Sequence, residues 1–122
     1  MTELQDTLTT ICNQLAAVVQ QQADDPNPSH DDFHTWGWAL SELLDRTYQV
    51  ALVLEEQVTH YGDTRILSDD EGASPAGRLL ETVTRLVQTR EALAHAQQHL
   101  SEYHAAISHI SVMVDPNAEV GS

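Results

Sequence analysis

The sequence predicts an all-α fold: a three-helix antiparallel bundle built on a long hairpin of the second and third helices. Three segments with apolar residues at helical spacing support this, and stretches rich in Asp, Pro, Gly and Ser separate them. The third segment also carries an apolar residue at every seventh position over five heptads, a pattern that favours side-by-side helix packing. We expect helices at about residues 3–22, 31–61 and 75–113.

The first predicted helix is amphipathic with one narrow apolar face. Thr2 and Gln5 have the spacing of a capping box, in which each side chain bonds the backbone N–H of the other residue. The apolar face that follows consists of Leu4, Leu8, Ile11, Leu15 and Val18. Two prolines in ADDPNPSHDD end this helix, and Ser29 is the expected N-cap of the next one.

The second predicted helix is apolar on two sides. Its main stripe, which we expect to form the core, consists of Phe33, Trp36, Leu40, Leu43, Leu44, Thr47, Val50, Ala51, Leu54, Val58 and Tyr61. Trp38, Tyr48 and Leu52 fall on roughly the opposite side of a helical wheel. A helix that is apolar on two sides is buried between neighbours, so it is either central in a bundle or part of an oligomer interface.

The third predicted helix begins at Ser74 and Pro75, an N-cap followed by a residue suited to the first helical position. Its heptad row consists of Leu79, Leu86, Leu93, Leu100 and Ile107. A rise of about 1.5 Å per residue makes this helix more than ~50 Å long against ~30 Å for the first helix.

The first helix is therefore too short to cover the hairpin, and we expect a homodimer, antiparallel in arrangement, to complete the bundle. A self-contained monomer, with the first helix folded along the hairpin, stays open as an alternative. A single domain spans 1–114, followed by a flexible polar tail at 115–122.

The charge balance restricts the partners of the chain. Nineteen acidic residues against five basic ones give a formal net charge of −14. A field of this sign repels nucleic acid and anionic membranes, so we expect neither partner. A basic protein is the expected charged partner, attracted by the loop acids Asp69, Asp70 and Glu71. No membrane span or secretory signal is readable, which favours a cytoplasmic protein, and the single Cys12 rules out an internal disulfide.

A stripe of His and Glu on the third helix is the alternative functional feature. Glu91, His95, His99 and Glu102 share one face, away from the leucine row. Imidazoles four residues apart on a helix can bind one divalent transition metal, but one helix rarely supplies a full ligand set. A ligand from the start of the second helix, His30 or His34, would approach His104 or His109 in an antiparallel hairpin. A solvated face is the commoner outcome of such a stripe.

Two carboxylate pairs are the only enzyme-like feature. They are Glu3 with Asp6 and Glu42 with Asp45. Acids three apart on a helix can hold Mg²⁺. The pairs resemble those of the all-α nucleotide pyrophosphohydrolases, which implies metal-dependent phosphoryl chemistry. The resemblance covers these four residues alone, and the lysines for phosphate and a first Glu-x-x-Glu are missing. No nucleophile motif or phosphate loop is present.

We therefore predict a non-catalytic, acidic helical interaction or adaptor protein without a cofactor. Trp38, Tyr48 and Leu52 are the predicted interface residues, because Trp and Tyr are enriched at interface hot spots. A metal-binding bundle that uses the His/Glu stripe is the first alternative. A nucleic-acid mimic that binds a basic protein is the second, and it requires the acids to form an ordered double row in space.

Overall fold

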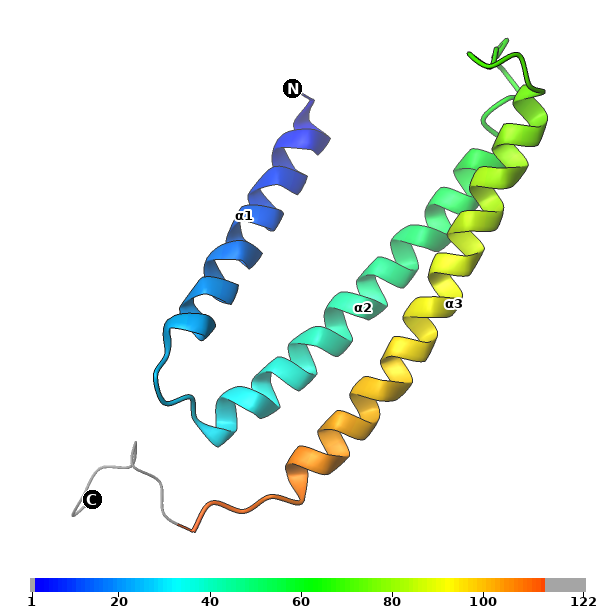
Figure 1. Cartoon of the computed structure of the whole chain (residues 1–122). Coiled ribbons are helices and arrows are strands. Elements are labelled where there is room, and N and C mark those ends of the chain that lie inside the picture. The colour runs from blue at the N-terminus through cyan, green and yellow to red at the C-terminus, as the bar shows by residue number, and fades with distance from the viewer. Residues whose placement is uncertain (1, 114–122) are drawn as a thin grey trace. The chain divides into compact units, whose positions relative to one another are not determined.

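The computed structural model of the chain describes residues 2–113, and every regular element in that range is an α-helix. The helices are α1 (Glu3–Asp24), α2 (His30–Thr59) and α3 (Pro75–Ser108) (Figure 1). The predicted all-α class with three helices is confirmed. The expected tail at 115–122 lies outside the described residues. Between residues 2 and 113, no helix is both long and apolar enough to cross a bilayer.

The predicted helix starts are correct, because the capping residues form as expected. The Thr2 backbone N–H donates to Gln5 Oε1 at 2.8 Å, and the Gln5 N–H donates to Thr2 Oγ1 at 3.1 Å. The same reciprocal pattern joins Ser29 and Asp32 before α2, and Ser74 accepts from the backbone of Gly77 before α3. Each cap satisfies N–H groups that the first turn of a helix leaves without a partner.

The chain divides into two compact units. One contains the residues up to Phe33 together with those from Val112 onward, and the other is His34–Ser111. The first unit holds α1, whose apolar face from Leu4 to Val18 is exposed by 40 to 67%. Among the described residues of this unit, α1 is accompanied only by the first turn of α2, since α2 belongs mainly to the other unit. The expected packing of this helix on the hairpin, like the dimer, stays a prediction.

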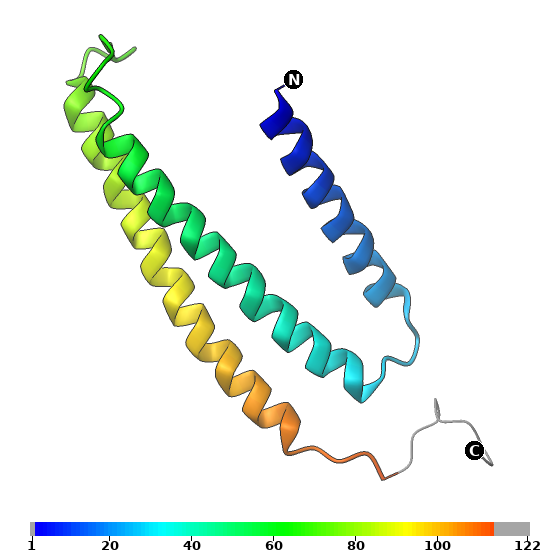
Figure 2. The ribbon, with the colours of Figure 1, turned by 180° about the vertical axis from the view of Figure 1, so that it is seen from behind.

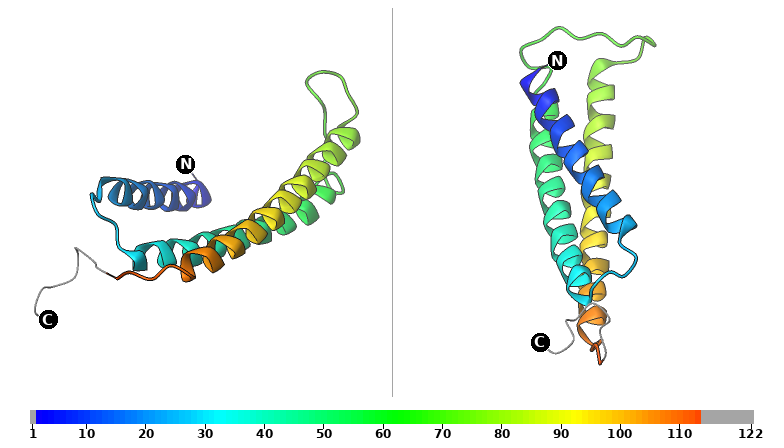
Figure 3. Two further views of the ribbon diagram at one scale, coloured as in Figure 1. Left: turned by 60° about the horizontal axis from the view of Figure 1, so that its bottom comes forward. Right: turned by 90° about the vertical axis from the view of Figure 1, so that its left-hand side faces the viewer.

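The second unit is an antiparallel hairpin of α2 and α3. The two helices run side by side over their length in Figures 1 and 2, and Figure 3 shows the gentle curve of the pair. The leucine row of α3 is half-buried at every position, from Leu79 to Ile107. The facing rows of α2, buried or half-buried throughout, are His34, Gly37, Ser41, Leu44, Tyr48, Ala51, Glu55 and Val58. The predicted packing along the heptads is confirmed.

The face that α2 turns to α3 differs from the expected core stripe. Leu44, Ala51 and Val58 belong to both, but Leu43 stays 39% exposed and Val50 55% exposed. The widest apolar arc of α2 is rotated by about a quarter turn from the row that meets α3. The physical reason is the small size of Gly37 and Ala51, the two buried residues of α2. These small residues let the backbones of α2 and α3 approach each other.

The third helix is shorter than the predicted 75–113 and ends at Ser108. The Ser108 hydroxyl donates to the carbonyl of His104 at 2.7 Å, and the N–H of Ile110 bonds Ile107 in a tighter turn. The β-branched Ile110 and Val112 that follow have low helix propensity, so the apolar pattern continues beyond the helix itself.

Candidate interaction surfaces

A charged cluster lies inside the hairpin, where heptad packing normally places apolar residues. Arg90 Nε donates to Glu55 Oε2 at 2.7 Å, and a second guanidinium nitrogen donates to Glu55 Oε1 at 3.1 Å. The remaining nitrogen donates to the Tyr48 hydroxyl at 3.1 Å, with the guanidinium carbon 5.5 Å from the centre of the tyrosine ring. The side chains of Arg90 and Glu55 are 24% and 13% exposed.

The electrostatics of this cluster favour the ionised pair. The hydrogen bond from Arg90 holds the pKa of the Glu55 carboxyl below its ordinary value, against the opposing effect of desolvation. The same bond raises the pKa of Arg90. Both carboxylate oxygens of Glu55 and all three guanidinium nitrogens of Arg90 take part in hydrogen bonds within the cluster. The cluster acts as a fixed polar layer between the helices.

Further polar contacts continue along the same interface. Gln97 Nε2 donates to the backbone carbonyl of Ser41 at 2.7 Å. Nearer the open end, the rings of His34 and His104 meet edge to face with centroids 5.6 Å apart, as expected for an antiparallel hairpin. A Cβ on Gly37 would lie 3.0 Å from the Tyr103 ring. The interface of α2 and α3 is therefore half polar, and it is fixed by specific pairs as well as by leucines.

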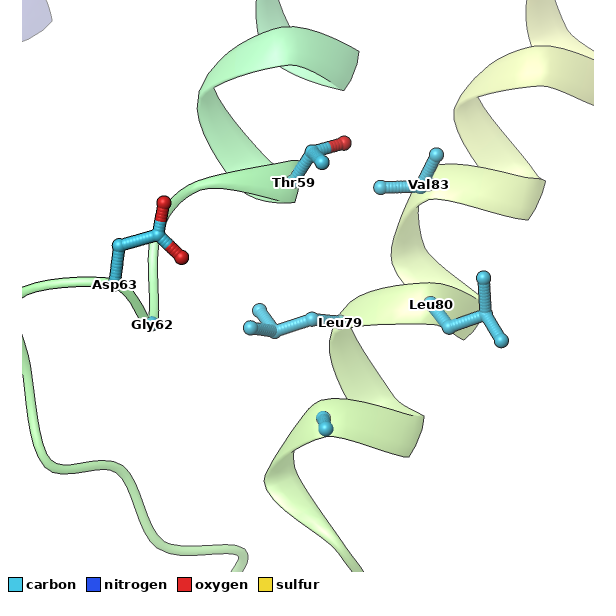
Figure 4. A pocket seen from close by; sticks show the side chains of 7 residues that line it. Thr59, Gly62, Asp63, Leu79, Leu80 and Val83 are labelled. Carbon is cyan, nitrogen blue, oxygen red and sulfur yellow. The ribbon is translucent and has the colours of Figure 1, made fainter.

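One side of the hairpin carries two open hollows, and we call it the groove face. The larger hollow, of about 400 Å³, lies near the connecting loop and is lined by Thr59, Gly62, Asp63, Ala76, Leu79, Leu80 and Val83 (Figure 4). The smaller one, of about 290 Å³, is lined by Asp45, Tyr48, Ala94 and Gln97. Thr59 and Asp45 belong to one heptad row of α2, and Ala76, Val83 and Gln97 belong to one heptad row of α3, so both hollows lie on the same side of the hairpin.

The three predicted interface residues belong to this groove face. Trp38 and Leu52 occupy the same heptad row as Asp45 and Thr59, and they are 66% and 44% exposed. Tyr48 lines the smaller hollow, with its hydroxyl engaged by Arg90. The structure thus brings the three to one side of α2, where an indole and a leucine remain available for contact. Leu80 of α3, at 68% exposed, adds to the same face.

The opposite side of the hairpin exposes a second, largely apolar row of α2, and all of its members except Gln57 were predicted to form the core. We call its members the seam residues: Leu40, Leu43, Thr47, Val50, Leu54 and Gln57. They alternate at spacings of three and four, as in a coiled-coil seam. Leu40 and Leu54 are 38% and 39% exposed, and the neighbouring Val53 is 54% exposed. The sequence does contain two heptad rows in α2 that are offset by one residue, but it does not show which of them meets α3.

The acidic loop is largely neutralised from within. Arg78 donates to Asp69 at 2.8 Å and to Glu71 at 2.9 Å, and it also reaches Glu81 at 3.3 Å. Hydrogen bonds from the backbone of Ala73 and from Arg78 lower the pKa of Asp69. Two of the three loop acids predicted to attract a basic partner are therefore already paired with an arginine of the same chain.

The His/Glu stripe of α3 lies in solvent. His99 Nδ1 is 3.7 Å from Glu102, and both side chains are more than 70% exposed. Glu91 and His95 are also exposed. In the part of the chain that the structure describes, no group of three or more His, Cys, Asp or Glu side chains is arranged to hold a metal ion. The metal alternative stays a prediction without a geometric observation in its favour.

The carboxylate pairs lie on the exposed surface of α1 and α2. Glu3, Asp6, Glu42 and Asp45 are all exposed, and Asp45 accepts a hydrogen bond from Gln49 at 2.9 Å. On the larger hollow, Asp63 is held by His60 at 2.9 Å, and this hydrogen bond raises the pKa of the imidazole. Asp63 shares this hollow with the Thr59 hydroxyl, which donates to the backbone carbonyl of Glu55 at 2.6 Å.

The comparisons with known proteins give no relative: no family model, no curated protein and no solved structure matches the chain.

Proposed function

We propose that the protein is a non-catalytic, acidic, cytoplasmic interaction protein that acts as a homodimer and presents its groove face to another protein. One observation carries this proposal. Helix α3 covers one face of α2, while large apolar side chains of α2 remain exposed on both sides of that face. Exposed apolar surface in contact with water is costly, so each flank is best explained by a macromolecular contact.

The chemistry of the groove face supports a protein partner. Trp38 is a large amphipathic side chain that is enriched at the energetic centres of protein interfaces. The two adjoining hollows are shallow and open, which suits side chains of a partner better than an enclosed small molecule. Asp45 and Asp63 border the hollows and give them a polar rim, so a partner with basic side chains around an apolar centre fits this face.

The test is affinity capture from the source cells with three forms of the full chain: wild type, the double variant Trp38→Ala with Leu52→Ser, and the control Gln88→Ala. Gln88 is exposed on α3 and lies in the heptad row of His95 and Glu102, away from both hollows. We expect the same protein to be enriched by wild type and by the control, and to be lost with the double variant. Identical capture by all three forms would remove the groove face as the partner site.

A further inference from the structure

The seam residues of α2 have a neutral environment on a strongly acidic chain. The net charge is −14, yet neither the seam residues nor the heptad rows on both sides of them contain an acid between residues 36 and 60. The outer row holds Ala39, Arg46, Val53 and His60, and the inner row holds Gly37, Leu44, Ala51 and Val58. The acids of this part of α2 lie elsewhere on its circumference: Glu42, Asp45, Glu55 and Glu56.

The neighbouring surface of α3 has the same character. The Gly37 contact with Tyr103 places the row of Tyr103 on the seam side of the hairpin, since the grooves occupy the other side. That row and the next one outward contain no acid: Arg78, Thr82, Arg85, Thr89, Ala92, Ala96, His99, Tyr103 and Ala106. Acids reach these rows of α3 only near their ends in the described residues, where Arg78 binds Asp69, Glu71 and Glu81 and where Glu102 lies 3.7 Å from His99. The middle of this side, from Thr82 to Ala96 on α3, contains no acid in either row.

We infer that the seam residues form the dimer interface, packing antiparallel against the same residues of a second copy to make a four-helix bundle. This deepens the proposed function, on which it rests, by naming the surface through which the copies associate. Like-charge repulsion opposes self-association of an acidic chain, and the side without acids in its middle is where two copies approach at the lowest electrostatic cost.

The seam is self-complementary in the antiparallel orientation. A two-fold axis midway between Tyr48 and Gln49 sets Leu43 opposite Leu54 and Thr47 opposite Val50 of the other copy. Leu40 then meets Gln57 at each end. Every layer combines an a with a d heptad position, the rule for antiparallel coiled coils. The Thr47 hydroxyl donates to the carbonyl of Leu43 at 2.7 Å, so its polar group is satisfied and its methyl group can face the partner.

Orientation also follows from the positions of the acids outside the seam. The loop that joins α2 to α3 carries Asp63, Asp69, Asp70 and Glu71 at one end of the hairpin. A parallel pair would bring two such loops together, whereas an antiparallel pair places them at opposite ends of the bundle. They are then about 40 Å apart, because each loop lies about 20 Å along the helix from the two-fold axis. Antiparallel packing therefore separates the loop acids of the two copies, of which Asp63 and Asp70 are not bound by Arg78.

The buried area suits a weak but specific dimer. Fully burying an aliphatic side chain removes on the order of 60–120 Å² of apolar surface from water, and the seam side chains and Val53 are covered by roughly half already. A pair of such faces contributes on the order of 600 Å² of apolar area. Since such interfaces are about 60% apolar, the total is about 1,000 Å², the lower limit for a specific contact. We expect micromolar self-association.

The first arm of the test uses Val50→Glu on the seam and Leu52→Glu on the groove face. The two positions are two residues apart and similarly exposed, at 55% and 44%. Light scattering should find wild type and Leu52→Glu as dimers, with the dissociation constant of Val50→Glu raised by roughly a hundredfold or more, because two carboxylates meet near the axis. A Leu52→Glu monomer with a Val50→Glu dimer would overturn the seam assignment but keep a dimeric interaction protein.

The second arm reads the orientation with full-length chains that carry Cys12→Ser. Leu40→Cys and Gln57→Cys chains are mixed, oxidised and identified by intact mass. A disulfide between the two different chains, with none between identical chains, is the expected result. Disulfides between identical chains would overturn the antiparallel arrangement, and a wild type that is monomeric throughout would overturn the dimer while leaving the groove-face capture as a separate test.

Discussion

At the residue scale, the most informative feature is the Arg90–Glu55–Tyr48 cluster. A charged pair between two helices stabilises a fold only if its hydrogen bonds compensate for lost hydration, and here both guanidinium–carboxylate bonds are present. The cluster also specifies register, because sliding α3 by one heptad would separate Arg90 from Glu55. Such a slip would preserve the leucine row, so the leucines alone do not define how far the helices overlap.

Replacing Arg90 with Met should lower the unfolding temperature at neutral pH, because it leaves the Glu55 carboxylate partly desolvated without a partner. The pKa of Glu55 is lowered in the fold, so the pair contributes its stability above the ordinary Glu range. This contribution is lost as the pH falls through the folded-state value. The difference between variant and wild type should therefore shrink in acid, as measured by circular dichroism melts from neutral to acidic pH.

The matched control is Arg85→Met on the same helix. Arg85 is exposed and hydrogen-bonds Gln88 at 3.0 Å, so its loss should leave the melting temperature within about a degree of wild type. Equal effects of the two arginine variants, or a difference that does not depend on pH, would show that the cluster contributes nothing beyond surface charge.

At the element scale, the sequence predicts helix starts better than helix faces. Thr2, Ser29 and Ser74 act through bonds within one turn, so their roles can be inferred from the sequence. The leucine row of α3 is equally clear from its spacing. The face of α2 was misassigned because its widest apolar arc and its α3-facing row differ. The small Gly37 and Ala51, with the polar partners Ser41 and Glu55, define that row, and apolarity alone does not reveal it.

Two leucines of α3 provide a direct test of the hairpin face. Leu93 is half-buried in the row that meets α2, whereas Leu80 is 68% exposed on the groove face. Leu93→Ala should reduce the free energy of unfolding by about 1–3 kcal/mol, less than for a fully buried leucine. Leu80→Ala should change it by no more than about 0.5 kcal/mol. Urea denaturation of both variants gives these values, and the reverse order would contradict the observed packing of α3.

At the scale of the whole molecule, the distribution of charge is more informative than its total. A net charge of −14 led us to expect a basic partner drawn to the loop acids, but Arg78 binds Asp69 and Glu71. Trp38 and Leu52 could be chosen from sequence because they stand apart from the main stripe. The seam residues could not be distinguished from core residues in the sequence. An apolar residue at core spacing gives the same pattern whether a helix of its own chain or a helix of a second copy covers it.

Sedimentation equilibrium of the wild-type chain is the measurement that tests the central claim most directly. The mass of one chain is 13.5 kDa. The account predicts a reversible dimer of twice that mass, with a dissociation constant that falls as salt rises from about 0.05 to 0.5 M, because screening weakens the repulsion between two acidic chains. A single species of monomer mass at every salt and at protein concentrations up to about 100 µM, well above the expected micromolar constant, would contradict it.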